Sequence, residues 1–181
     1  MLLIILGLIL WTGSHYWKFL APDHRAKLGD KGKGIVAGAS VLAIVLIIIG
    51  YRSADFIAVW NPPSAIQHAT HVLMLVAFFV FGMSATTGRL RGYLRHPMLI
   101  SVKLWAIAHL LVNGDLAAII LFGGMLAWAV GSVILINKAE PNWVRPEPGN
   151  KSKDILLVVI TVVTFTIAVA IHIALGVNPF G

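Results

Sequence analysis

Residues 34–51 read GIVAGASVLAIVLIIIGY, an apolar run without a charged residue. At ~1.5 Å of rise per residue, a helix of this length crosses most of the ~30 Å hydrocarbon core of a bilayer. Comparable runs occupy about residues 1–17, 34–51, 66–84, 98–113, 115–136 and 155–176. The sequence therefore predicts an all-α fold, a polytopic transmembrane helix bundle of about six spans that forms a single domain over residues 1–181.

Positive charge is distributed unevenly along the chain. Of the fourteen Lys and Arg residues, all but Arg52 lie in the connections after the first, third and fifth runs or close to them, with Lys103 in the half of the fourth run that adjoins the third connection. Because Lys and Arg near span ends stay on the cytoplasmic side, this pattern predicts an integral membrane protein with a fixed orientation. With six spans both termini lie outside, which is the periplasm if the protein sits in a bacterial inner membrane.

Composition excludes several classes of function. The chain is 59% hydrophobic and 12% charged, about half the charge of an average soluble domain. Its net charge of +7 does not indicate nucleic acid binding, because the bilayer explains basic residues beside apolar runs. The chain has no cysteine, which excludes thiolate metal sites and a covalently attached c-type haem. All seven Asp and Glu residues lie in loops or at run ends, which argues against a carboxylate metal site within the membrane.

Histidine is the side chain within the runs that could carry chemistry. Five of the seven histidines lie within the runs or at their ends, namely His15, His68, His71, His109 and His172. Polar groups at this depth are costly and usually functional. Neutral imidazole is also the commonest metal ligand and a frequent haem ligand. The sequence therefore predicts histidine ligation of a metal or a haem.

Two of these histidines are paired with tryptophan at helical spacing. His109 follows Trp105 by four residues, and His15 follows Trp11 by four, so each pair shares one helix face. An imidazole beside a large flat aromatic is a suitable wall for a planar cofactor. Asn113, one turn beyond His109, is placed to orient such a ligand by hydrogen bonding. The structural alternative is a histidine that donates to a carbonyl, with tryptophan in the interfacial belt.

Helix geometry gives each histidine a depth. His71 and His109 both lie ~6 Å to the outer side of their span centres, His172 lies ~10 Å to that side, and His15 lies ~6 Å to the inner side. Depth alone favours His71 with His109 as two axial ligands, although a tilted helix could still bring His15 to His109. The second ligand therefore stays open among His15, His71 and His172. A metal held by His68 and His71, three residues apart, is a further alternative.

Other motifs have both a functional and a structural interpretation. Arg95-His96-Pro97 begins the fourth span with cations and N–H groups suited to an anion, or it is a basic loop facing lipid headgroups. Gly123, Ala127 and Gly131 recur at four-residue spacing, which suits either a homodimer face or packing within the chain. Gly29 to Gly34 (GDKGKG) predicts a flexible turn, and Asn113-Gly114-Asp115 predicts a tight turn between antiparallel fourth and fifth spans.

Taken together, several motifs resemble the NnrU family over essentially the whole chain. They are Gly13-Ser14-His15, Pro22, Arg25, Arg95-His96-Pro97, Lys103-Leu104-Trp105, His109-Leu110-Leu111, Asn113-Gly114, Leu121-Phe122-Gly123 and the stretch from His172 to Phe180. NnrU proteins are polytopic membrane proteins associated with denitrification and nitric oxide metabolism. They are similar to the plant zeta-carotene isomerase, a membrane enzyme that uses histidine-ligated haem b to isomerise a cis double bond.

The resemblance implies a protein that binds haem b, with the ligands of the isomerase matching His15 and His109. It implies either a haem-dependent isomerase or a redox protein, with an apolar polyene or a small gas as ligand. One alternative is a non-enzymatic accessory or haem-delivery subunit of a respiratory complex. Another is an S-adenosylmethionine-dependent membrane methyltransferase, whose cofactor segment Arg95-His96-Pro97 resembles. That family usually has Tyr and Gly where this chain has Leu99 and Ser101, and it carries a later acidic pair that this chain lacks.

Overall fold

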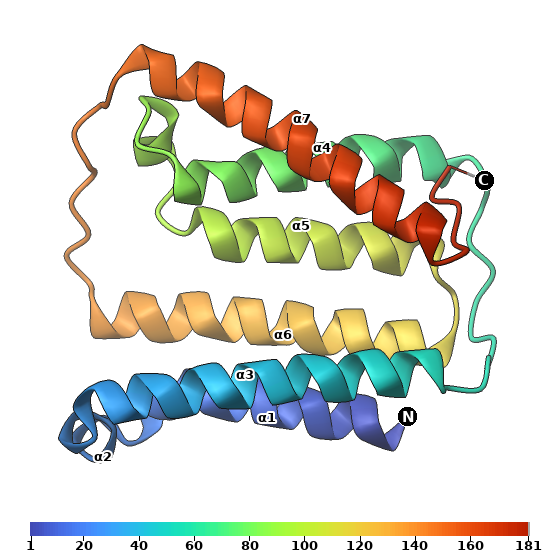
Figure 1. Cartoon of the computed structure of the whole chain (residues 1–181), viewed down its shortest axis with the longest axis horizontal. Helices are drawn as coiled ribbons and strands as arrows, with labels where there is room; N and C mark the ends of the chain where they lie inside the picture. The colour runs from blue at the N-terminus through green and yellow to red at the C-terminus, as the bar shows by residue number, and fades with distance from the viewer. Residues whose placement is uncertain (181) are drawn as a thin grey trace. The chain divides into compact units, whose positions relative to one another are not determined.

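The computed structural model describes residues 1–180 and consists of helices joined by loops (Figure 1). The elements are α1 (Leu2–Leu20), α2 (Pro22–Lys27), α3 (Gly29–Arg52), α4 (Ile66–Ala85), the 3-10 turn η1 (Leu90–Tyr93), α5 (Pro97–Val112), α6 (Leu116–Ala139) and α7 (Lys151–Ala174). No strand occurs in the described residues, and a lone bridge pairs Ala58 with Asp115. The predicted all-α class is confirmed.

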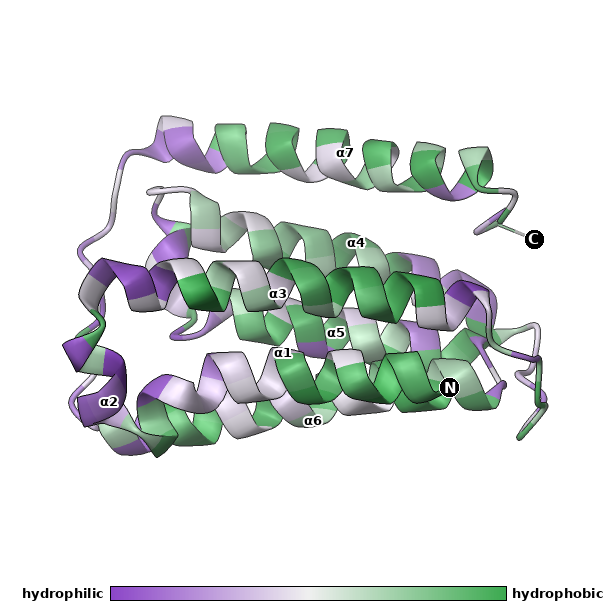
Figure 2. Cartoon of the chain, turned by 60° about the horizontal axis from the view of Figure 1, so that its bottom comes forward, coloured by the Kyte–Doolittle hydropathy of each residue, from purple (hydrophilic) through white to green (hydrophobic). Residues whose placement is uncertain are grey.

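Membrane-length helices account for most of the chain. Within residues 1–180, five helices are long and apolar enough to cross a membrane: α1, α3, α4, α6 and α7. The remaining apolar helix, α5, has 16 residues and is shorter than the others. Figure 2 shows hydrophobic colouring along these helices and hydrophilic colouring at many of their ends. The structure thus fits an integral membrane protein, and the predicted count of about six spans is close.

The helices fall into two compact units that alternate along the chain. The first unit comprises Met1–Pro62 and Asn113–Ala139, and the second comprises Pro63–Val112 and the chain from Glu140 onward. In the first, α1 packs against α3 and α6; in the second, α4 packs against α5 and α7. The spans on either side of Asn113-Gly114-Asp115 belong to different units, so their expected antiparallel pairing stays a prediction. This turn is where the chain passes from one unit to the other.

Close helix approach in the first unit depends on small residues. A Cβ at Gly7 would lie 2.8 Å from the carbonyl oxygen of Ala43, and one at Gly50 would lie 2.7 Å from the amide nitrogen of Ile4. Ile4 and Ala43 are fully buried at this antiparallel interface. Lipid tails are as apolar as leucine, so tight van der Waals packing stabilises helix pairs in a membrane.

The start of α3 differs from the sequence prediction. Residues 29–34, expected to form a flexible turn, are helical. The turn is confined to Gly29, whose φ of 47° is a conformation that favours glycine. Asp30 lies in the first helical turn, where a carboxylate is favourable, and it pairs with Lys33 at 2.9 Å. An exposed pair of this kind contributes only about 0.2–0.5 kcal/mol, so it offsets part of the low helix propensity of the glycines, and the long apolar helix that follows supplies the rest.

The second unit has its core where α4 meets α7. Leu157 is fully buried and packs with Val80 and Met83. Gly82 faces Leu157 so closely that a Cβ there would lie 2.6 Å from its Cδ1. Phe78 and Phe165 make an edge-to-face contact with ring centroids 5.7 Å apart. These contacts run antiparallel along α4 and α7 and fix the register of the two helices.

Candidate histidine sites

His15 lies in an aromatic cluster between α1 and α6. Its Nδ1 donates to the carbonyl oxygen of Trp11 at 2.8 Å. Its ring stacks on Trp11 at 4.3 Å between centroids and meets Trp128 edge-on at 5.3 Å. Because a carbonyl oxygen only accepts, Nδ1 carries the proton and the lone pair of the neutral ring is on Nε2. This tautomer is the one that suits coordination through Nε2.

Trp128 is a member of this cluster that the sequence did not reveal. It is 112 residues from Tyr16, whose hydroxyl donates to the carbonyl oxygen of Trp128 at 2.8 Å. Among the residues that the structure describes, the indole nitrogens of Trp11 and Trp128 are buried and have no hydrogen-bond partner. An indole N–H buried in this way costs about 1–3 kcal/mol. The cluster therefore brings polar groups into an otherwise apolar unit. Trp128 could not be predicted as a member, because helical spacing relates only residues of the same helix.

His109 repeats the local geometry of His15 on α5. Its Nδ1 donates to the carbonyl oxygen of Trp105 at 2.9 Å, which again places the lone pair on Nε2. The rings of Trp105 and His109 are tilted, with centroids 5.3 Å apart. His172 on α7 belongs to the same unit as His109. Both predicted Trp–His pairs thus exist as ring contacts, each on one helix.

The other two histidine candidates, His172 and His71, differ in which ring nitrogen makes a hydrogen bond. His172 donates from Nδ1 to the carbonyl oxygen of Ala168 at 2.7 Å, in the same manner as His15 and His109. His71 instead donates from Nε2 to the carbonyl oxygen of Pro179 at 2.7 Å, and its ring lies 4.9 Å from that of Phe180. Ligation through that nitrogen would require His71 to lose this hydrogen bond. His71 was predicted as a ligand from its depth in the membrane, and depth does not reveal this contact with the C-terminal segment.

A compact metal centre finds little support in the geometry. The rings of His68 and His71 are 6.3 Å apart and steeply inclined. Within residues 1–180, no group of three or more His, Cys, Asp or Glu side chains could hold a metal ion. This observation argues against a metal ion held by His68 and His71. It does not test haem ligation, because a haem needs at most two axial ligands from the protein.

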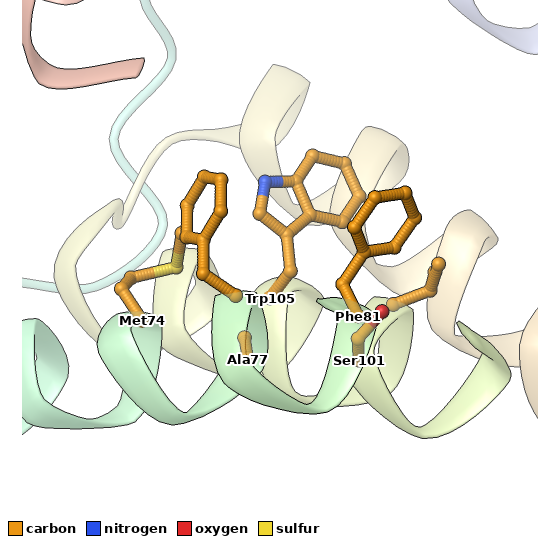
Figure 3. Close-up of a pocket in the computed structure, with 7 residues that line it drawn as sticks. Met74, Ala77, Phe81, Ser101 and Trp105 are labelled. Carbon is orange, nitrogen blue, oxygen red and sulfur yellow. The ribbon is translucent and has the colours of Figure 1, made fainter. Parts of the chain in front are cut away.

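An apolar groove lies along α4 and α5, and Figure 3 shows the side chains that line it. Its volume is about 230 Å³, and its walls are Met74, Ala77, Phe78, Phe81, Ser101, Val102 and Trp105. The hydroxyl of Ser101 donates to the carbonyl oxygen of Met98 at 2.8 Å, so it is engaged within its own helix. The groove therefore suits an apolar occupant, and Trp105 connects it to His109.

The Arg95-His96-Pro97 motif lies at the start of α5. The carbonyl oxygen of His96 accepts the first helical bond, from the amide of Ile100 at 2.9 Å. The guanidinium of Arg95 donates to the carbonyl oxygen of Glu140, which ties the chain after α6 to this helix start. Asn113 follows the last residue of α5 by one position. Arg95 therefore has a hydrogen-bond partner within the chain, and both anion binding and contact with lipid headgroups stay predictions for this motif.

The small-residue stripe on α6 also has a partner within the chain. A Cβ at Gly131 would collide with the hydroxyl of Tyr16 on α1. Near Gly123, by contrast, the described residues leave open space around a Cβ position. Gly131 thus serves packing within the first unit, and the homodimer face stays a prediction that concerns Gly123 and the exposed Ala127.

Comparison with known proteins gives one clear relationship. No curated protein and no solved structure shows a significant match to the chain. The family model described as NnrU protein matches residues 3–179, which is nearly the full length. The motifs quoted above lie within this range, as do both Trp–His pairs. The chain therefore belongs to the NnrU family.

Proposed function

We propose that this protein binds haem b within the membrane, with His109 as an axial ligand. The observation that supports the proposal best is the anchored tautomer of the ring. The Nδ1–H of His109 donates to the carbonyl oxygen of Trp105, which orients the imidazole and leaves the Nε2 lone pair for iron. Haem-ligating histidines are commonly held by such a hydrogen bond from the second nitrogen.

The donor set suits haem better than a bare metal ion. Iron in a porphyrin already has four nitrogen ligands and takes one or two imidazoles from the protein. The chain has no cysteine, and its carboxylates lie in loops or at the ends of the apolar runs, so histidine is the axial ligand that the spans can supply. Trp105 and the groove formed by Met74, Phe78 and Phe81 add an apolar surface beside His109.

The second axial position has two well-oriented candidates. His172 belongs to the same unit as His109 and has the same Nδ1–carbonyl anchor, to Ala168. His15 belongs to the other unit and has the same Nδ1–carbonyl anchor and a stacked tryptophan. The resemblance to the isomerase favours His15. We place His71 behind both, because its Nε2 is bound to Pro179.

The activity that follows is a haem-dependent isomerisation or a redox reaction linked to nitric oxide metabolism. Bound haem would supply an iron that changes oxidation state and can take a small gas or polarise an apolar substrate. The contribution of the protein is to orient the ligands, exclude water from the site and offer apolar walls. The acidic side chains lie in loops or at the ends of the apolar runs, so proton transfer by Asp or Glu is not part of the proposal.

An absorption spectrum of the detergent-purified protein, oxidised and reduced, tests this proposal. We expect a sharp Soret band, split reduced bands and about one haem per chain. His109→Ala should remove the colour while the protein still inserts. His24→Ala is the matched control, because His24 lies on the short helix α2 beside Trp17. A protein that stays colourless after addition of hemin would contradict haem binding and favour the accessory-subunit alternative.

A further inference from the structure

The groove on α4 and α5 leads toward the basic end of its unit. Ser101 and Phe81 line the groove, and each lies one helical turn from the end of its helix, at Pro97 and Ala85. At ~1.5 Å per residue they lie ~6 Å from those ends, and Trp105 lies ~12 Å from Pro97. The groove therefore covers the depth just below the membrane surface, where the first part of a lipid acyl chain lies.

Two loops meet at this end and hold each other in place. Residues 86–96 connect α4 to α5, and residues 140–150 lead into α7. The guanidinium of Arg145 lies 4.3 Å from the ring centroid of Tyr93, and a Cβ at Gly92 would be 3.0 Å from the carbonyl oxygen of Pro146. The amide of Leu90 donates to Asp154 Oδ1 at 3.2 Å. The loops therefore form one preorganised surface at the mouth of the groove.

This surface is rich in cations that have no carboxylate partner. Arg89 and Arg91 are exposed, and in the described part of the chain neither makes an ion pair. The carboxylate of Asp154 is held by Leu90, and the remaining carboxylates of the two loops are Glu140 and Glu147. Six basic residues occur between residues 86 and 96 and between 140 and 154, against these three acids. This excess of basic over acidic side chains favours an anionic partner.

Exposed aromatic and apolar side chains lie on the same loops. Tyr93 is 65% exposed, Trp143 41% and Val144 83%. Side chains of this kind beside Arg and Lys are typical of the interface between headgroups and hydrocarbon. Neither a nucleotide nor a soluble acidic partner would account for an apolar groove that continues from this surface into the depth of the membrane.

We propose that the α4–α5 groove and the loops at its mouth bind an anionic phospholipid. One acyl chain lies between Phe81, Val102 and Trp105, and the phosphate lies against Arg89 and Arg91. The groove contributes no unengaged hydroxyl, which suits an acyl chain, and guanidinium groups are well suited to phosphate oxygens. This inference does not depend on haem binding, because the phosphate contacts Arg89 and Arg91 lie outside the proposed cofactor contacts. Phe81 and Trp105 belong to both proposals.

Thermal unfolding of the purified full-length protein with added lipid tests the site. We expect phosphatidylglycerol to raise the unfolding temperature by about 5–10 °C at a hundredfold excess over its Kd, and phosphatidylcholine with the same chains to do so far less. Inorganic phosphate, added at the same concentration, is the control that distinguishes a site for the whole lipid from a site for free phosphate. A full shift with phosphate alone, or equal shifts with both lipids, would overturn the proposal.

Two kinds of variant locate the site. In Arg89→Gln/Arg91→Gln the preference for phosphatidylglycerol should disappear, whereas in Lys27→Gln/Lys31→Gln, which removes two charges from the other unit, it should remain. If both double variants lost the preference for phosphatidylglycerol equally, the preference would come from general surface charge and not from this site. Val102→Trp fills the groove and should also remove the shift. If that variant is unstable, phosphatidylglycerol with very short chains replaces it, and an unchanged shift with such chains would exclude the groove.

Discussion

The imidazole of His15 is fixed by Trp11 in two ways, through a 2.8 Å hydrogen bond from Nδ1 to the tryptophan carbonyl and through ring stacking at 4.3 Å. His109 and Trp105 share the same hydrogen bond at 2.9 Å. A helix can provide this anchor without any other element, because the i−4 carbonyl lies directly below the side chain. The histidine of each pair is therefore held in one orientation before any cofactor binds.

The second axial ligand is tested by His15→Ala and His172→Ala. Loss of the true second ligand should convert a low-spin spectrum to a high-spin one and lower haem affinity by about tenfold or more. The other variant should keep the parent spectrum, as should His71→Ala, because Nε2 of His71 is bound to Pro179. A change of spin state confined to His71→Ala would contradict the tautomer argument.

Packing of α1 on α6 is tested at two glycines of one helix. Gly131→Ala places a methyl group where the Tyr16 hydroxyl lies, so it should break the bond to the Trp128 carbonyl and destabilise the protein by about 1–3 kcal/mol. Gly123→Ala meets open space among the described residues and should be neutral or slightly stabilising, because alanine is the better helix former. Unfolding in mixed detergent with increasing sodium dodecyl sulfate measures the difference. Equal stability of the two variants would contradict the packing.

The C-terminal segment should be released when its histidine partner is removed. His71→Ala loses the bond to Pro179 and the ring contact with Phe180. We expect amide exchange around Val177, which donates to the carbonyl oxygen of His172 at 2.9 Å, to become about fivefold faster. His68→Ala, one turn away on α4, is the control. Unchanged exchange in His71→Ala would mean that other contacts hold the segment.

Orientation in the membrane can be measured directly because the chain has no cysteine. Phe56 and Val144 are 79% and 83% exposed in loops that follow the second and fifth spans. With both termini outside, Phe56→Cys should react with an impermeant maleimide in intact cells, and Val144→Cys should react only after lysis. The reverse pattern would place the basic loops outside.

Sequence patterns were sufficient for most of the fold. The apolar runs at 66–84 and 98–113 correspond to α4 at Ile66–Ala85 and α5 at Pro97–Val112, because a membrane helix must satisfy its own backbone and be apolar along its length. The prediction at residues 29–34 was wrong, since glycine indicates a turn but does not say which glycine makes it. Here Gly29 makes the turn, and the Asp30–Lys33 pair begins the helix.

The candidate site was predictable only in part. The Trp11–His15 and Trp105–His109 contacts follow from four-residue spacing, which is local geometry. The contact of His15 with Trp128 and the bond of His71 to Pro179 join residues far apart in the chain. Apolar helices have few features that specify their neighbours, so hydrophobic periodicity could not identify these partners.

By itself, the sequence determined the all-helical class, the approximate spans, the NnrU motifs and the histidines paired with tryptophan. These properties depend on composition and on the 3.6-residue period of one helix. The tertiary structure alone decided that α4 pairs with α5 and α1 with α3 and α6, that Trp128 completes the surroundings of His15, and that Pro179 occupies Nε2 of His71. These properties depend on which small residues let two helices approach, and that is settled only when the whole chain packs.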